Sequence, residues 1–199
     1  LAETVDGRIV RLGAPGVRIN PFDIPHDTNR PDALTRRALF LHTLIGVLLG
    51  EQPPPQERAA FDTAITATYT AAGINHDSST WSRPAPLLAD LAATLTKIGE
   101  TNPAAATLAA RLSPWVDGAF KDLFAGPSTT QPAGHLVVWS TRHLPDELRA
   151  AGMLLALDAI WRDVDQPAPQ VSTTDPTRAQ RQARLANHYG QATQPVGQP

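Results

Sequence analysis

Few residues of this chain could bind the phosphates of a nucleotide. Its 199 residues include two lysines, Lys97 and Lys121. A phosphate-binding loop of the P-loop type needs glycines whose backbone N–H groups surround the phosphates, followed by Lys and then Ser or Thr. Neither lysine stands in that context. The sequence therefore predicts that the chain by itself binds no ATP or Mg²⁺ as a cofactor and hydrolyses no ATP.

The run Leu154–Asp158 superficially matches another part of an ATPase site, an apolar strand whose terminal acid positions Mg²⁺ and water. However, the run lies inside a helical pattern that begins at Pro145 and reaches Asp163. A helix does not present an acid as a strand end does. We therefore expect Asp158 to bond a neighbouring arginine or amide, because a buried carboxylate needs a partner.

The histidines do not form a recognisable metal site. No two of them have the i, i+4 spacing of a helical zinc site, and the chain has no cysteine. His42 lies beside the apolar face of a predicted helix, so we expect it to be a partly buried core residue. No metal ligands are predicted. The histidines considered were His26, His42, His76, His135, His143 and His188.

The segment Ser140–His143 follows an apolar run and could supply a nucleophile with a base. It lacks the Gly-x-Ser-x-Gly turn that exposes a nucleophilic serine. Its better interpretation is the loop after a strand, and ligands bind outside the carboxyl ends of parallel strands. Arg142 is therefore our candidate for contacting a nucleotide or a neighbouring subunit. The alternative is a salt bridge from Arg142 to Asp146 or Glu147.

The first two-thirds of the chain should position these groups with two short strands and a set of helices. Residues 8–20 read as two strands, Ile9–Leu12 and Val17–Asn20, separated by a Gly/Pro turn. Apolar residues at helical spacing then predict the helices. Their expected ranges are 31–49, 56–72, 84–98 and 103–112, followed after an interruption at Pro114 by a short helix over 115–124.

The remaining third should contribute a further strand to the sheet, a helix and a tail. His135–Ser140 is apolar without a helical period, which is typical of a strand buried on both faces of a parallel sheet. We expect Leu136–Trp139 to lie beside Ile9–Leu12, so that Val138→Asp would unfold this region. Gly152–Trp161 is apolar nearly all round and should be a buried helix packed over the strand. Residues 166–199 are too poor in large apolar residues to fold, so a disordered tail is predicted.

Composition limits the classes of function. The net charge of −2 gives no electrostatic argument for nucleic-acid binding. No apolar run reaches the roughly 18 residues that a transmembrane helix needs, so no transmembrane segment is predicted. The absence of cysteine is compatible with a cytoplasmic protein.

Asn20-Pro21-Phe22-Asp23, placed after a strand and a turn and before a long helix, resembles a motif of a motor family. The family comprises the AAA-like ATPases of type IV secretion and conjugation, which are related to the DNA translocases HerA and FtsK. Further segments follow in the family's order across residues 1–165. They are Leu1–Gly7, Phe40–Gly46, Tyr69–Ile74, Leu123–Ser128, Leu136–Trp139 and Gly152–Trp161.

The resemblance implies a helix-rich α/β fold, namely a partial RecA-like P-loop ATPase domain with an all-helical insertion. Its parts would be core strands and a loop over 1–30, the helical insertion over 31–126, a core strand and helix over 127–165, and the tail over 166–199. The complete family protein would use ATP and Mg²⁺ and would move DNA or protein during secretion. It would work as a homo-hexamer with a membrane-associated channel, in the cytoplasm at the inner face of the plasma membrane.

In that family the phosphate-binding loop would precede Leu1, and an acidic strand would follow Asp165. We therefore expect this chain to be an internal fragment of such a motor, inactive alone. The competing hypothesis is a free-standing helical interaction protein without nucleotide chemistry.

Overall fold

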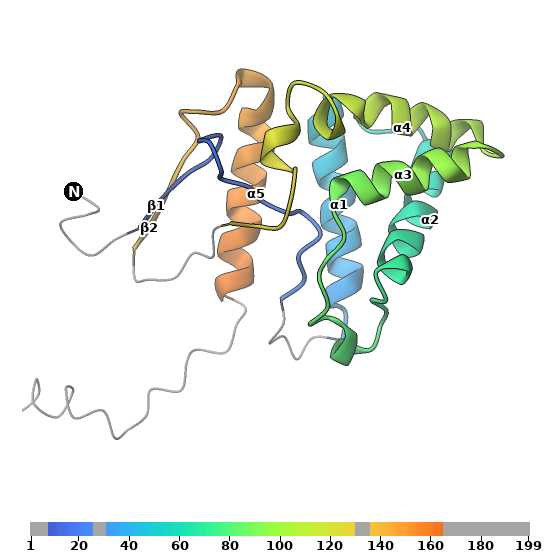
Figure 1. Ribbon diagram of the computed structural model, residues 1–199, viewed down its shortest axis with the longest axis horizontal. Helices are drawn as coiled ribbons and strands as arrows, with labels where there is room; N and C mark the ends of the chain where they lie inside the picture. The colour runs from blue at the N-terminus through green and yellow to red at the C-terminus, as the bar shows by residue number, and fades with distance from the viewer. Residues whose placement is uncertain (1–7, 26–30, 130–135, 165–199) are drawn as a thin grey trace, which may run out of the picture. The chain divides into compact units, whose positions relative to one another are not determined.

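A pair of short parallel strands joins segments that are far apart in the sequence. The computed structural model describes residues 8–25, 31–129 and 136–164. Strand β1 (Arg8–Arg11) pairs in parallel with β2 (Val137–Ser140), and Val10 lies opposite Trp139 (Figure 1). The prediction that these two segments are neighbours in one sheet is confirmed. Everything between them forms the long crossover that a parallel pair requires.

Four α-helices make up most of that crossover (Figure 1). They are α1 (Ala33–Leu49), α2 (Pro55–Ala71), α3 (Leu88–Gly99) and α4 (Pro103–Val116). Prolines in the first turns of α2 and α4 fit there, because those N–H groups have no helical partner. After α2 the chain turns at Gly73, whose φ of +73° is the left-handed conformation that favours glycine.

The core is built from the apolar faces of these helices. Phe61, Ile65 and Tyr69 recur at intervals of four along α2 and all are buried, as predicted. Leu41 and Ile45 of α1 are likewise fully buried. The spacing of apolar residues in the sequence thus identified the correct faces of both helices.

Several predicted boundaries were wrong. Helix α3 begins at Leu88 rather than at Pro84, because Pro86 restricts the preceding residue to extended backbone. Helix α4 runs through Pro114 to Val116. The proline lacks one backbone N–H, but it lies in the last turn, where the helix is about to end. Residues 115 and 116 of the predicted short helix belong to α4, and the remainder of its range, 117–124, contains only the 3₁₀ turn η3 (Lys121–Leu123).

The extended segment at residues 17–20 is not a strand of the sheet. Its backbone bonds instead to the last residue of η3 and to the segment that follows it. The Ile19 N–H donates to the Leu123 carbonyl at 2.9 Å, and the Thr129 N–H donates to the Arg18 carbonyl at 3.0 Å. These bonds bring the residues before the Asn20–Asp23 motif against residues more than 100 positions later.

The strand β2 is not buried on both faces, and this prediction was wrong. Val138 is 39% exposed, whereas Val10 of β1 is 2% exposed. Side chains alternate between the two faces of a sheet. Helix α5 (Asp146–Val164) covers the face that carries Val10 and Leu12, while the face that carries Val138 is left open by the described residues. The apolar run of β2 therefore does not indicate that the strand is buried on both faces, although its apolar residues do not alternate with polar ones.

Helix α5 lies between the β1–β2 sheet and α1 (Figure 1) and is buried on one face only. The prediction of a helix buried all round was wrong, because large apolar residues of its other face are exposed. No helix within the described ranges is long and apolar enough to cross a membrane. The described residues belong to one compact unit, Leu1–Gln166. The predicted tail at 166–199 lies outside them.

Candidate functional site

The Asn20–Asp23 motif forms a tight turn held by the side chain of Asn20. The Asn20 Oδ1 accepts a hydrogen bond from the Phe22 N–H at 3.1 Å. The Nδ2 of the same carboxamide donates to the Pro86 carbonyl at 3.0 Å, next to the start of α3. Asn20 is 1% exposed. Only a short side chain with both a donor and an acceptor can fix the turn and the α3 approach together.

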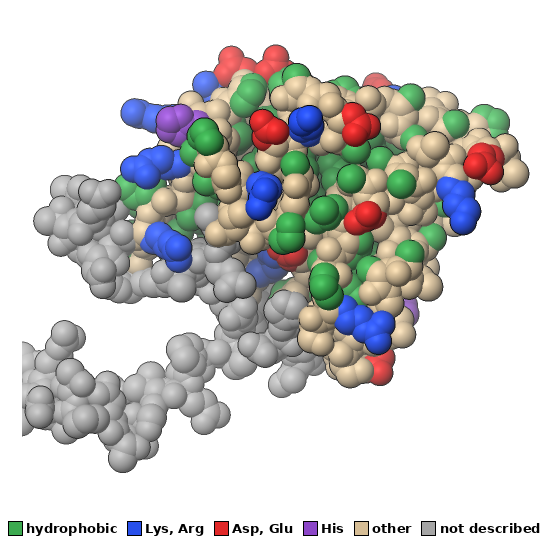
Figure 2. Space-filling view, in the orientation of Figure 1, with side chains coloured by type: hydrophobic (Ala, Val, Ile, Leu, Met, Phe, Trp, Pro, Cys, Tyr) green, Lys and Arg blue, Asp and Glu red, His purple; other side chains and the backbone are tan. Residues whose placement is uncertain are grey.

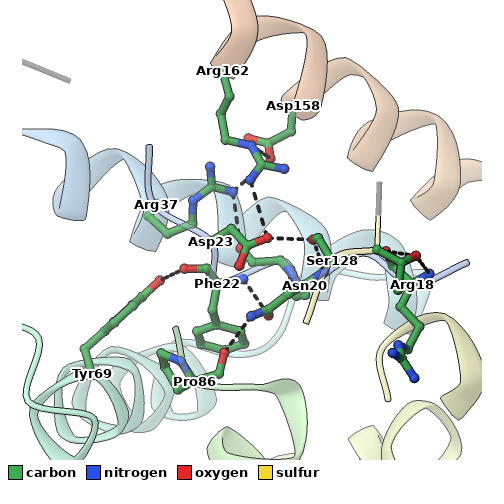
Figure 3. Close-up of polar contacts among 12 residues, drawn as sticks. Arg18, Asn20, Phe22, Asp23, Arg37, Tyr69, Pro86, Ser128, Asp158 and Arg162 are labelled. Carbon is green, nitrogen blue, oxygen red and sulfur yellow. Dashed lines mark hydrogen bonds and ion pairs between the residues drawn. The ribbon is translucent and has the colours of Figure 1, made fainter. Parts of the chain in front are cut away.

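Ser128 ties the motif to the segment that leads towards β2. Its Oγ accepts from the Asn20 N–H at 2.8 Å and donates to the Asp23 Oδ2 at 2.6 Å. Figure 3 shows Ser128 between these two motif residues. Both ends of the motif are therefore fastened by one hydroxyl from a distant segment.

Phe22 joins the motif to α2. Its side chain is fully buried, and its ring centroid lies 5.7 Å from that of Tyr69. The Tyr69 hydroxyl donates to the Phe22 carbonyl at 2.8 Å. Burial raises the pKa of Tyr69 well above its usual range, so the hydroxyl keeps the proton that it donates. The helical layer is thus anchored to the motif by one aromatic contact and one buried hydrogen bond.

A buried ion-pair cluster lies against the other side of the motif (Figure 3). The Nη1 of Arg37, on α1, donates to the Asp158 Oδ2 at 2.9 Å and to the Pro21 carbonyl at 3.2 Å. Arg162, one turn after Asp158 on α5, places its Nε 3.1 Å from the same carboxylate oxygen. The prediction that Asp158 bonds a neighbouring arginine from within a helix is confirmed.

The charges of this cluster balance. Arg162 also lies 3.9 Å from the carboxylate of Asp23, so two arginines face two aspartates. Burial lowers the pKa of Arg162, and the nearby charge of Arg37 lowers it further. The carboxylates of Asp158 and Asp23 offset part of this lowering, and buried charges require such partners. The ion pairs and hydrogen bonds of the cluster join α1, α5 and the motif.

The two lysines of the chain both lie at exposed positions of its helical part. Lys97 is exposed in the last turn of α3, and Lys121 is exposed in η3. Among residues 8–25, 31–129 and 136–164, no group of three or more His, Cys, Asp or Glu side chains could hold a metal ion.

Arg142 is exposed in the loop that follows the carboxyl end of β2, where the sequence placed it. Within the described part of the chain, the ion-pair partner of Asp146 is Arg149, at 2.9 Å, not Arg142. The structure does not bring Arg142 into the cluster around Asp23. Its contact with a nucleotide or a subunit stays a prediction.

His42 is half-buried, as expected. Its Nε2 lies 2.6 Å from the Asp62 Oδ1, and its ring meets the edge of Phe61 at 4.9 Å between centroids. These contacts join α1 to α2, so His42 has a structural role.

Sequence reasoning missed Arg37, Tyr69 and Ser128 as partners of the motif. Arg37 could have been found, because it lies four and eight residues before the buried Leu41 and Ile45. A charge on the apolar face of a helix signals a buried partner. Ser128 carries no such signal, since its role depends on a contact across 105 residues.

The arrangement of these elements has a counterpart among solved structures. It is similar to the structure of VirB4 of Thermoanaerobacter pseudethanolicus, with a TM-score of 0.72 and 24% sequence identity over 82% of this chain. The chain has a VirB4-like fold. The resemblance to the secretion motor family that the motifs indicated is thereby confirmed for the fold. The match spans 64% of the VirB4 chain, less than two thirds of its length. No family model matches this chain, and no curated protein matches it.

Proposed function

We propose that this chain is part of a type IV secretion motor ATPase. The observation that supports this is the VirB4-like fold, assembled around the Asn20–Asp23 motif. In this proposal β1, β2 and α5 belong to a RecA-like P-loop ATPase domain, and α1 to α4 form its helical insertion. The motor drives DNA or protein through a secretion channel, as a homo-hexamer at the cytoplasmic face of the membrane.

In the proposed motor this chain has a structural role and provides one residue that contacts a nucleotide or a neighbouring subunit. The Arg37–Asp158 clamp fixes α5 against the helical layer. Arg142, exposed beyond the carboxyl end of β2, contacts a nucleotide or the neighbouring subunit. ATP and Mg²⁺ would be held by residues that this chain does not supply. The purified chain alone should therefore show no ATP hydrolysis above that of a mock preparation.

A chimera tests the proposal. Residues 8–164 of this chain replace the matched region of the Thermoanaerobacter VirB4, and ATP hydrolysis is measured beside unmodified VirB4. We expect the chimera to hydrolyse ATP and Arg142→Ala to reduce its rate by about tenfold or more, the size of lost electrostatic stabilisation. Arg149→Ala is the matched control, since Arg149 is exposed and pairs with Asp146. A folded chimera without activity, beside active VirB4, would overturn the proposal.

A free-standing interaction protein is the alternative function. The observation that favours it is the exposed apolar face of α5, which suits a protein partner. On this alternative the chimera would fold without hydrolysing ATP.

A further inference from the structure

The carboxyl ends of β1 and β2 are held side by side. Arg11 ends β1 and lies in register with Ser140, which ends β2. The next backbone N–H, that of Leu12, donates to the Ser140 carbonyl at 2.9 Å. The turns that follow also pack together, because a Cβ atom on Gly13 would lie 2.6 Å from the His143 carbonyl oxygen. Two adjacent turns thus form the edge at which open parallel sheets bind ligands.

Three polar side chains belong to this edge of the sheet. Arg11 and Ser140 lie on the same face, because residues in register on neighbouring strands point to the same side. It is the face that carries Val138 and that the described residues leave open. Arg142 follows Ser140 by two residues, and both arginines are exposed. Two long, cationic side chains on adjacent turns can therefore reach one ligand at this edge.

Positive charge dominates the segments that form this edge. Residues 8–22 contain three arginines and no acid, and residues 136–145 contain one arginine, one histidine and no acid. Figure 2 shows blue Lys and Arg side chains, with a purple His among them, over the β1–β2 side of the molecule. The acids that follow next are Asp146 and Glu147 in the first turn of α5, and Asp146 pairs with Arg149. The whole chain carries a net charge of −2, so its folding, and not its composition, collects this positive charge.

Among the described residues, neither Arg11 nor Arg142 has a carboxylate partner. Arg37 and Arg162, by contrast, face aspartates inside the fold, and Arg111 faces two glutamates. An arginine that its own chain does not engage keeps its N–H donors for a ligand. Two such arginines lie on these adjacent turns.

Phosphate is the anion that this arrangement suits. A guanidinium presents paired, planar N–H donors that match the oxygens of a phosphate group, and arginine is favoured where phosphate is recognised. A phosphate group has oxygens on several sides, so it can accept from two guanidinium groups and from a serine hydroxyl at once. A carboxylate is already matched by a single guanidinium.

We propose that Arg11, Ser140 and Arg142 form a binding site for a phosphate group. The proposal adds Arg11 and Ser140 to the contact given above to Arg142, and in that respect it rests on the proposed function. Because both arginines are exposed, water and salt weaken the contact, and we expect a dissociation constant of about 1 mM. The site therefore complements phosphate-binding residues that this chain does not supply and does not hold a nucleotide by itself.

NMR signals of the arginine Nε–H groups test the proposal in the full 199-residue chain. Inorganic pyrophosphate is the probe, titrated to about 10 mM at constant ionic strength so that screening does not change. The signals of Arg11 and Arg142 should shift together and saturate. Arg11→Gln and Arg142→Gln should each weaken binding by about tenfold, the size of one lost hydrogen bond between charged groups.

Arg58→Gln is the matched control, because Arg58 is an exposed arginine of α2 and its loss should leave the affinity unchanged. All three variants alter exposed side chains, so circular dichroism should show an unchanged fold. Citrate, which carries several carboxylates, should bind about tenfold more weakly than pyrophosphate if phosphate geometry is recognised. ATP and pyrophosphate of equal affinity would assign the site to phosphate alone, whereas tighter binding of ATP would assign it to a nucleotide.

Three results would overturn the proposal. Equal shifts of Arg58 and Arg11 would show nonspecific anion binding, and citrate as tight as pyrophosphate would assign the arginines to an acidic protein surface. The third is the absence of any saturating shift. The outcome is separate from that of the VirB4 chimera. Pyrophosphate binding beside an inactive chimera would refute the secretion function alone, and an active chimera without pyrophosphate binding would refute this site alone.

Discussion

Arg37 and Asp158 form a 2.9 Å ion pair across 121 residues of sequence, with side chains only 5% and 12% exposed. The pair fastens α5, which follows the sheet, to α1, the first helix of the intervening layer. The same arginine also donates to the Pro21 carbonyl. One buried guanidinium thus links the motif to both helices.

Asp158→Asn should strongly destabilise the fold. The substitution removes a negative charge that faces Arg37 and Arg162, and breaking a buried pair by removing one partner costs about 3 kcal/mol or more. Urea unfolding followed by circular dichroism measures the loss. Asp146→Asn is the control, since its pair with Arg149 is exposed and should contribute under about 1 kcal/mol. Equal effects of the two substitutions would contradict the clamp.

Asn20→Ala should destabilise the chain by about 2 kcal/mol or more. The change leaves the Phe22 N–H and the Pro86 carbonyl without their partner inside the core, and buried unsatisfied groups cost about 1 to 3 kcal/mol each. Asn75→Ala is a useful comparison, because the bond from the Asp77 N–H to Asn75 is exposed. An Asn20→Ala variant as stable as Asn75→Ala would refute the role of the carboxamide.

Aspartate substitutions on the two strands should separate the faces of the sheet. Val10→Asp places a charge at a 2% exposed position and should cost roughly 3 kcal/mol or more. Val138→Asp alters a side chain that is 39% exposed and should cost under about 1 kcal/mol. Thermal melts of both variants measure the contrast. Comparable losses would show that both faces are covered.

The buried hydroxyl of Tyr69 should make the free energy of unfolding decrease at high pH. Burial raises its pKa in the folded chain, while the unfolded phenol ionises near its ordinary pKa of about 10. The stabilisation is complete below pH 10 and is lost as pH rises above it towards the folded pKa, because only the unfolded state releases the proton. At pH 11 the loss is roughly 1.4 kcal/mol.

Comparing urea midpoints at pH 9 and pH 11 in the unsubstituted chain and in Tyr69→Phe isolates this contribution. Tyr69→Phe also loses the bond to the Phe22 carbonyl, so it should be less stable by about 1 kcal/mol at pH 9. Its additional loss at pH 11 should be smaller than that of the unsubstituted chain. Parallel declines in both proteins would rule out Tyr69 as the titrating group.

Local patterns in the sequence predicted the helices and one key contact. The buried faces of α1 and α2 follow from apolar residues at helical spacing, which reports one-sided burial directly. The pairing of Asp158 with an arginine follows from the cost of burying an unpaired carboxylate. The order of motifs around Asn20–Asp23 indicated a resemblance to the secretion motor family, and the fold of the chain is similar to that of VirB4.

Only the tertiary structure decided which side of each apolar element is covered. An apolar run such as Val137–Trp139 fits a strand covered on one face as well as on two, because the sequence does not state what packs against it. The partners of the motif, Ser128 and Tyr69, likewise come from segments whose approach depends on the whole fold. Sequence by itself determined the main helices, the two strands that pair and the groups that require partners. The long-range packing decided which residues became those partners. It also left one apolar face of α5 uncovered by the described residues.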